Sequence, residues 1–397
     1  MKRILAIILC FVLVGMTAAC GGSSSGKEEV FRVGTFNPLS GANGDIGQGL
    51  VKGLELAIKH INAAGGILGA QIVLTTYDDM SDTDASVNAV ERLIEQDKVH
   101  AIIGSTISGN DLAIGHIVEA AQIPCVAPGT AASWLEQGWT YMFRSTLSVK
   151  YNVSSIINAC GILGIKSIAL FNQANEFGEN GSKVMTEAAA KAGITILGKE
   201  TYEEGDTDFT AQFTKLAALG ADAYYMTCNT PVIGNAVRQA RANGFQGFIL
   251  GDQLYGSAGP KEVAGSAMKN VIFSAPYVLV KSPADAATEN QRKFFQAYLD
   301  EYGSLPDVEQ AMRAYDAMYI LYEGVKRAGT FDGPAVRDAI LSINDFVGLG
   351  GAGNVNGTFD FTMTKDGDGL MQAALYWVDE TGKDHLLDSV LDNLLKN

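Results

Sequence analysis

Residues 102–111 read Ile-Ile-Gly-Ser-Thr-Ile-Ser-Gly-Asn-Asp, an apolar strand followed by a glycine- and hydroxyl-rich turn and then by a helix. A turn of this kind directs free backbone N–H groups and the positive end of a helix dipole at one point beyond the strand, where small anions bind. We expect Ser108 to cap the helix and to donate its hydroxyl to a carboxylate. The glycine-lysine pattern of a P-loop is absent, so the turn does not indicate a nucleotide site. Most such turns in α/β proteins only cap a helix, so the rest of the chain must show whether this turn binds a ligand.

The same strand-to-helix unit is repeated on both sides of this segment. The pattern predicts strands over 31–36, 70–77, 100–104, 124–127 and 142–145, and helices over 47–64, 84–97 and 108–122. A second series has strands over 166–171, 195–200, 223–227, 248–251 and 271–275, and helices over 150–163, 179–192, 208–219 and 232–243. Alternating strands and helices form a parallel sheet with helices on both faces. The sequence therefore predicts an α/β fold of two doubly wound parallel-sheet lobes.

The C-terminal part of the chain breaks this alternation. Helices are expected over 286–302, 308–328 and 334–341 with no strand between them, and such helices need an existing sheet face to cover. We expect the chain to return to the first lobe near 277–280 and to cross again near 370, where 375–378 would add a strand to the second lobe. The expected lobes are 30–148 plus 279–369, and 149–278 plus 370–397. Several crossings make a hinge, and a small ligand is usually held in the cleft between hinged lobes.

The first 29 residues have the layout of an export signal followed by a tether. Lys2 and Arg3 precede an apolar run over 4–16, which is too short to span a bilayer as a permanent helix. Small residues directly before Cys20 resemble the bacterial lipoprotein signal, in which that cysteine becomes the lipidated first residue, although Thr17 stands where the pattern usually has Leu. We expect a signal peptide over 1–19 and a lipid-anchored tether over 20–29, the alternative being cleavage without lipid.

The composition excludes several function classes. Of 397 residues, 29 are Lys or Arg and 44 are Asp or Glu, and the net charge of −15 disfavours nucleic acid and anionic lipid surfaces as partners. Cys125, Cys160 and Cys228 lie in separate apolar segments, so we expect buried free thiols. The cysteine and histidine spacing does not indicate a metal or redox site, and no histidine pairs with a plausible nucleophile. We therefore expect no metal, no cofactor and no enzymatic activity.

Short motifs along the chain resemble those of one family. Residues 38–41 (PLSG), 61–69 (INAAGGILG), 77–79 (YDD) and 238–241 (RQAR) keep the order and approximate spacing of the periplasmic leucine/isoleucine/valine-binding proteins of ABC transporters, the type I solute-binding fold. The resemblance runs from residue 30 to the C-terminus. It implies a protein outside the cytoplasmic membrane that binds an amino acid between two lobes and delivers it to an ABC permease. We expect a monomer that is attached to that membrane only through its lipid anchor.

The resemblance also implies which residues bind the carboxylate of the ligand. In this family the carboxylate is bound by a serine in a strand-to-helix turn like that of residues 102–111, together with backbone and hydroxyl groups of the next strand-to-helix loop. These positions match Ser108 and the loop Gly129, Thr130 and Ala131. Ala131 stands where the family usually has Thr or Ser, so one donor is missing unless Thr130 replaces it.

The remaining family positions concern the ammonium group and the walls of the cleft. An acidic residue that meets the ammonium falls at Asp252 or, with a shift of one residue, at Gln253, and a tyrosine position is occupied by Asn229. Phe177 matches an aromatic residue that closes over the ligand. Ile46 replaces a bulky aromatic wall.

Elementary electrostatics agrees with this assignment in part. A zwitterion needs donors at one end and a carboxylate at the other, because burying an unpaired charge costs several kcal/mol. Ser108 and Asp252 would supply that polarity. Ala131 and Asn229 change the hydrogen-bonding capacity, so another small polar or carboxylated solute is one alternative to an amino acid. An alternative to the transport function is that the protein is a ligand-sensing module that signals to a membrane partner.

Overall fold

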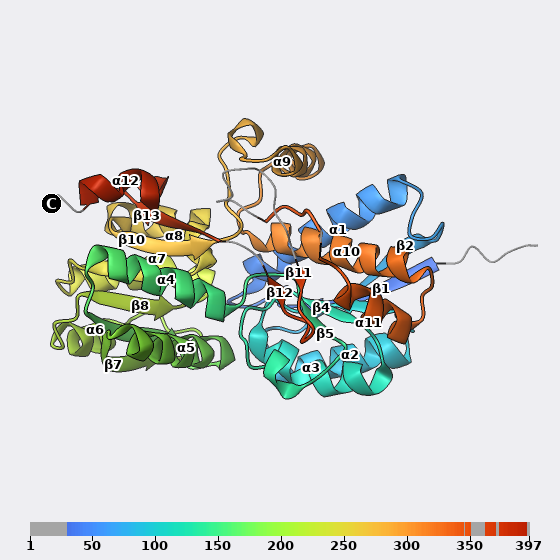
Figure 1. Ribbon diagram of the computed structural model, residues 1–397, viewed down its shortest axis with the longest axis horizontal. Helices are drawn as coiled ribbons and strands as arrows, with labels where there is room; N and C mark the ends of the chain where they lie inside the picture. Colours follow the sequence, from blue (N-terminus) through green and yellow to red (C-terminus); the bar gives the residue numbers. More distant parts are fainter. Residues whose placement is uncertain (1–29, 345, 351–361, 371–372, 395–397) are drawn as a thin grey trace, which may run out of the picture.

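The structure of the protein is a computed structural model that describes residues 30–344, 346–350, 362–370 and 373–394. The expected signal peptide, the tether and Cys20 lie outside the described residues, as does most of the glycine-rich stretch 348–361. Two lobes lie side by side along the long axis of the molecule (Figure 1).

The first lobe is built on a parallel sheet with the strand order β2-β1-β3-β4-β5. Its strands are β1 (Val30–Asn37), β2 (Gln71–Asp78), β3 (Ala101–Ile103), β4 (Cys125–Ala127) and β5 (Met142–Arg144). The connecting helices are α1 (Gly44–Ala63), α2 (Thr83–Glu95) and α3 (Ser108–Ala121). The central strands β3 and β4 are fully buried, because helices cover both faces of the sheet.

The second lobe repeats this order. Its parallel strands are β6 (Ser167–Gln173), β7 (Thr195–Tyr202), β8 (Ala223–Thr227), β9 (Phe248–Gly251) and β10 (Val271–Ala275), in the order β7-β6-β8-β9-β10. The antiparallel strands β13 (Ala374–Val378) and β14 (Asp384–Leu386) extend the sheet beyond β10. Its helices are α4 (Val149–Leu163), α5 (Glu176–Ala192), α6 (Thr210–Ala217), α7 (Thr230–Ala242), α8 (Ala258–Ala264) and α12 (Leu387–Leu394).

Three helices after β10 return to the core of the first lobe. They are α9 (Glu289–Tyr302), α10 (Gln310–Ala328) and α11 (Gly333–Leu341). Helix α10 packs along α1 and over β3 and β4, and the two helices run side by side in Figure 1. A Cβ atom on Gly53 of α1 would lie 1.9 Å from the carbonyl oxygen of Ala311, so glycine is what allows this close approach. Short 3-10 turns occupy Leu135–Gln137, Gln253–Gly256, Gly265–Met268 and Pro283–Asp285.

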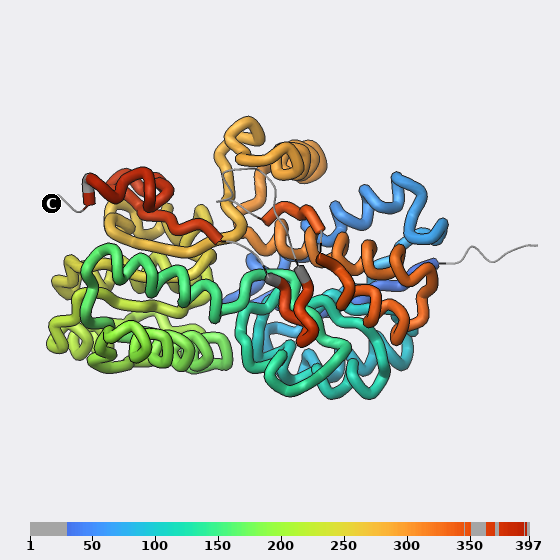
Figure 2. Tube along the Cα trace, in the orientation of Figure 1, coloured from blue at the N-terminus to red at the C-terminus, as the bar shows by residue number. Residues whose placement is uncertain are grey.

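The chain passes between the lobes more than once, as the trace in Figure 2 shows: it leaves the blue first lobe, builds the green and yellow second lobe, and returns as orange α10. The strands β11 (Thr362–Met363) and β12 (Gly369–Leu370) form a small antiparallel pair. This pair sits against the first lobe, where the Arg144 N–H donates to the Gly367 carbonyl at 2.8 Å. The expected fold class, two doubly wound parallel-sheet lobes joined by several crossings, is confirmed.

Other expectations concern single side chains. Cys125, Cys160 and Cys228 are buried free thiols, as predicted. Asp82 caps α2 by accepting a hydrogen bond from the Ala85 N–H at 2.7 Å. In the described part of the chain, no group of His, Cys, Asp and Glu side chains is arranged to hold a metal ion. No helix among the described residues is both long and apolar enough to cross a membrane.

Candidate ligand-binding site

A cavity of about 430 Å³ lies between the lobes, where the carboxyl ends of strands from both parallel sheets meet. This is the usual ligand position in open α/β sheets. Its lining residues are Asn43, Ile46, Ser81, Thr83, Thr106, Ile107, Ser108, Gly109, Asn110, Leu112, Ala113, Thr130, Asn175, Glu176, Phe177, Glu204, Asn229, Asp252, Leu254, Gln310 and Arg313. Six of the eight residues expected from the sequence to bind ligand, all except Gly129 and Ala131, are in this set.

The amino-terminal end of α3 forms one wall of the cavity. Ser108 is the first helical residue of α3 and Ile107 precedes it as the N-cap without a side-chain bond, so the expectation that Ser108 caps the helix was wrong. Because its backbone is already helical, the Ser108 side chain turns to the neighbouring loop, where its Oγ accepts a hydrogen bond from the Ala131 N–H at 3.2 Å. The hydroxyl proton of Ser108 remains available to a ligand. The N–H groups of Asn110 and Asp111 donate to the Ile107 carbonyl, whereas those of Ser108 and Gly109 come too early in α3 to have a partner within the helix.

The loop after β4 contributes Thr130 to the same wall. Thr130 lines the cavity, whereas Gly129 and Ala131 do not. A Cβ atom on Gly129 would lie 2.3 Å from Oδ2 of the buried Asp111, so the glycine lets this loop approach α3 closely. The Ala131 N–H is used by Ser108. Thr130 is therefore the hydroxyl of this loop that faces the cavity.

The second lobe supplies the opposite wall. Phe177, Asn229 and Asp252 are all nearly buried and all line the cavity. Gln253 is buried but does not line it, so Asp252 is the member of that pair that faces the cleft. The Asn229 amide nitrogen donates to Oε1 of Gln173 at 3.1 Å, which orients the Asn229 side chain. Ile46 of α1 faces this wall from the first lobe.

Asp252 and a buried ion pair at the start of α10 bring charged groups to the cavity. Burial raises the pKa of Asp252 to about 7, and this is partly offset by the hydrogen bond from the Leu254 N–H and by the nearby Arg313. Arg313 is itself buried and forms an ion pair with Glu309, with the Arg313 Nε 2.6 Å from Oε2 of Glu309. Arg313 Nη1 also donates to the Pro128 carbonyl at 3.1 Å.

Several residues that line the cavity were not predicted from the sequence. The Asn43 amide nitrogen donates to Oγ of Ser81 and to Oε1 of Glu204, both at 3.0 Å, and so bridges the two lobes. Glu204 lies two residues after the end of β7, so the rule that ligands bind beyond the carboxyl ends of parallel strands could have identified it. Gln310 and Arg313 carry no comparable signal, because only the packing of α10 places them at the cleft.

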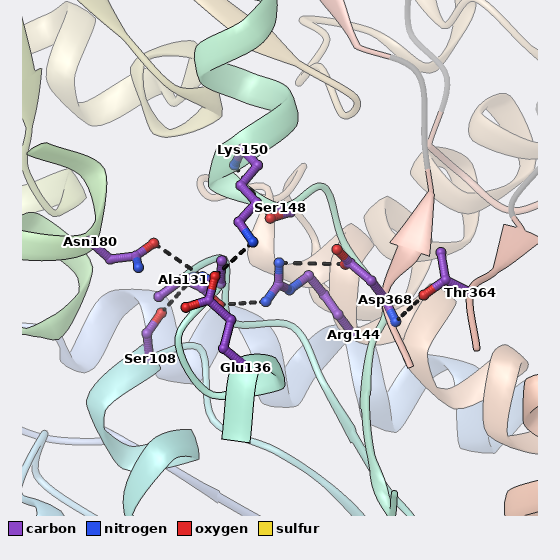
Figure 3. A network of polar contacts seen from close by, with 10 residues as sticks. Ser108, Ala131, Glu136, Arg144, Ser148, Lys150, Asn180, Thr364 and Asp368 are labelled. Atoms are coloured by element: carbon purple, nitrogen blue, oxygen red, sulfur yellow. Dashed lines mark hydrogen bonds and ion pairs between the residues drawn. The ribbon is translucent and has the colours of Figure 1, made fainter. Parts of the chain in front are cut away.

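A buried network of polar contacts joins Ser108, at the start of α3, to the segments where the chain crosses between the lobes (Figure 3). Arg144, at the end of β5, donates to the Ala131 carbonyl and lies 3.4 Å from Oδ1 of Asp368, next to β12. Its guanidinium also stacks 4.7 Å from the ring centre of the fully buried Trp134. On the other side, the Ala132 N–H donates to Oδ1 of Asn180 in the second lobe at 3.1 Å. The wall that contains Ser108 is thus held by both lobes and by the crossing segments.

Comparisons with known proteins extend over nearly the whole described chain. A family profile described as "Periplasmic binding protein" matches residues 30–383. The chain is similar to the leucine-, isoleucine-, valine-, threonine- and alanine-binding protein of Pseudomonas aeruginosa, with 26% identity over 362 residues that cover 89% of this chain and 94% of that protein. It is also 26% identical to the leucine-specific-binding protein of Salmonella typhimurium over 278 residues, 70% of this chain and 75% of the relative.

The chain is also similar in fold to solved structures of binding proteins. The leucine-binding protein LivK of Thermotoga maritima matches with a TM-score of 0.79 and 25% identity, over 90% of this chain and 97% of that one. The substrate-binding protein LivJ of Streptococcus pneumoniae, in complex with isoleucine, matches with a TM-score of 0.78 and 25% identity, over 90% and 98%. A solute-binding protein of R. palustris in complex with benzoate shares the fold, with a TM-score of 0.78 and 20% identity over 90% and 96%.

Proposed function

The chain belongs to the periplasmic binding protein family, which comprises substrate-binding proteins of transporters and not enzymes, and from this premise we propose that it binds a small amino acid and delivers it to an ABC permease. The amino acid would be held in the interlobe cavity, and closure of the lobes would supply the affinity. The protein would act outside the cytoplasmic membrane, after removal of residues 1–19, as a monomer anchored through lipid on Cys20.

The polarity of the cavity carries this proposal. Ser108, Thr130 and the free N–H groups of α3 form a donor wall on the first lobe, and Asp252 presents a carboxyl group from the second lobe. A free amino acid has a carboxylate and an ammonium group on one carbon atom, so it can satisfy both walls at once. Either charge buried without a partner would cost several kcal/mol, which makes this pairing selective.

The names of the relatives support the same ligand class. The P. aeruginosa relative is named for binding leucine, isoleucine, valine, threonine and alanine, and the S. typhimurium relative for binding leucine. The S. pneumoniae structure holds isoleucine. In our assignment, Phe177 covers the bound amino acid, Ile46 contacts its side chain, and Asn229 orients the ammonium group. Gly129 and Ala131 support the donor wall from behind through their contacts with α3.

A carboxylated solute without an ammonium group is the second candidate. The raised pKa of Asp252 favours it, because a neutral carboxyl group needs no cationic partner and can itself donate a hydrogen bond. The two candidates differ in whether the ligand brings a positive charge to Asp252.

A panel of the common amino acids and of simple aliphatic and aromatic carboxylates, tested by thermal shift and then by calorimetry, distinguishes these candidates. We expect at least one amino acid to raise the melting temperature, since binding at 100 times the Kd stabilises the folded state by about 2.7 kcal/mol. The deaminated analogue of that amino acid should bind more weakly. Shifts produced only by carboxylates without an ammonium group would refute the amino acid and support the second candidate.

A further inference from the structure

We infer that the amino acid bound in this cleft has a side chain ending in an uncharged group that both donates and accepts hydrogen bonds, held by Gln310 and Arg313 of α10. A hydroxyl or a carboxamide has this chemistry. The inference rests on the proposed function, because it assigns the carboxylate of the ligand to the Ser108 wall and its ammonium group to Asp252.

Gln310 presents an unused polar atom to the cavity. Its side chain is only 1% exposed and lines the cavity, and its Oε1 has no hydrogen-bond partner within the part of the chain that the structure describes. Buried polar groups in native proteins are almost always paired, because an unpaired one has given up its hydrogen bond to water without replacing it. A donor on the ligand would satisfy this oxygen.

Arg313 offers donors on the same side of α10. A guanidinium has five N–H groups, and three of those of Arg313 are used, two by Glu309 and one by the Pro128 carbonyl. The N–H groups that remain are on its two terminal nitrogens, and Arg313 lines the cavity. Gln310 and Arg313 are three residues apart on one helix and therefore share a face. Together they provide an acceptor and donors for one ligand group.

The charges next to Gln310 and Arg313 disfavour an ionised group on the ligand side chain. Arg313 is already neutralised by Glu309, and the proposed ammonium group of the ligand takes Asp252. A further carboxylate beside Arg313 would lie near Glu309 and Asp252, and a further ammonium there would be repelled by Arg313. The other carboxyl groups that line the cavity, those of Glu176 and Glu204, belong to the second lobe and not to α10. An uncharged polar group avoids both costs.

An apolar side chain would occupy the same space but leave the Gln310 oxygen and the Arg313 N–H groups unpaired. Sites that contain buried polar groups discriminate strongly against analogues that lack the matching group. We therefore expect the protein to bind a polar amino acid at least about tenfold more tightly than its apolar isostere.

Isothermal titration calorimetry with isosteric pairs tests this inference. Threonine is compared with valine, and asparagine with leucine, in the wild-type protein and in Gln310→Met, which keeps the length of the side chain but removes its amide. We expect at least one polar member to bind about tenfold more tightly than its isostere in the wild type, and Gln310→Met to bring that ratio close to one. Gln296→Met is the matched control, because Gln296 lies exposed on α9 and outside the cavity, and it should leave the ratio unchanged.

The outcomes separate this inference from the proposed function. If valine and leucine bind as tightly as threonine and asparagine, the inference is overturned while the amino-acid function stands. If no amino acid binds, both fail. The wild-type comparison of the pairs needs no variant, so it decides the inference even if Gln310→Met does not fold.

Discussion

At the scale of single residues, the Ser108 hydroxyl and the Asp252 carboxyl lie on opposite walls of one cavity. We expect Ser108→Ala to weaken ligand binding by about 1–2 kcal/mol and Asp252→Asn by about 2–3 kcal/mol, because the second change removes a charged partner. Asn at 252 keeps an oxygen that can accept the Leu254 N–H, so the local turn should survive. Calorimetric titration measures both effects. Unchanged affinity in both variants would mean that the ligand binds elsewhere.

The protonation of Asp252 gives a second prediction at this scale. Burial raises the pKa of Asp252 to about 7, and only the ionised carboxylate can pair with an ammonium group. The affinity for an amino acid should therefore fall as the pH drops below about 7, by up to about tenfold per pH unit, and level off above it. Titrations at pH 6, 7 and 8 measure this slope, which Asp252→Asn should abolish. A ligand that binds more tightly at pH 6 than at pH 8 would contradict an ammonium group at Asp252.

At the scale of elements, the packing of α10 on α1 brings Gln310 and Arg313 to the cleft. A Cβ atom on Gly53 would collide with the Ala311 carbonyl at 1.9 Å, so Gly53→Ala should push the helices apart and destabilise the protein by about 1–3 kcal/mol or more. Gly161→Ala in α4 is the control, since its Cβ would meet nothing within 4 Å. That variant should be neutral or stabilising by up to about 1 kcal/mol. Urea unfolding compares the two, and equal stability of both variants would refute the close approach of the helices.

At the scale of the whole molecule, buried carboxyl groups set the pH dependence of stability. Burial raises the pKa of Asp79 to about 6 and those of Asp252 and Asp316 to about 7, against a reference value of 3.8 for an unperturbed Asp. Between these values the folded protein binds more protons than the unfolded chain, so its stability falls as the pH rises through this window. Exposed carboxylates with lowered pKa values, such as Asp78 and Asp222, act in the opposite direction only at lower pH.

We therefore expect the ligand-free protein to lose stability steadily as the pH rises from about 4 to about 7. The net charge of −15 at pH 7 adds self-repulsion in the same direction. Differential scanning calorimetry between pH 4.5 and 8.5 measures the melting temperature. A melting temperature that rises from pH 5 to pH 8 would show that the buried carboxyl groups are paired in a way that lowers their pKa values.

Local patterns in the sequence predicted most of the framework. The strands β8, β9 and β10 have the bounds expected for them, because a run of apolar residues between turn signals reports burial within one element. The alternation of strands and helices predicted the class of fold, but it did not predict the order of the strands within either sheet. The short elements α8, β14 and α12 were missed, since segments this brief show no clear period.

By itself, the sequence determined that strands and helices alternate in two lobes and that a donor-rich turn precedes the helix beginning at Ser108. The tertiary structure decided that Asp252 rather than Gln253 faces the cavity, that the Ser108 hydroxyl meets the Ala131 N–H, and that Gln310 and Arg313 reach the ligand site. The physical reason is one of range. Periodicity depends on neighbours within one helix or strand, whereas the direction of a loop side chain and the position of a helix end over a cleft depend on packing between segments far apart in the chain.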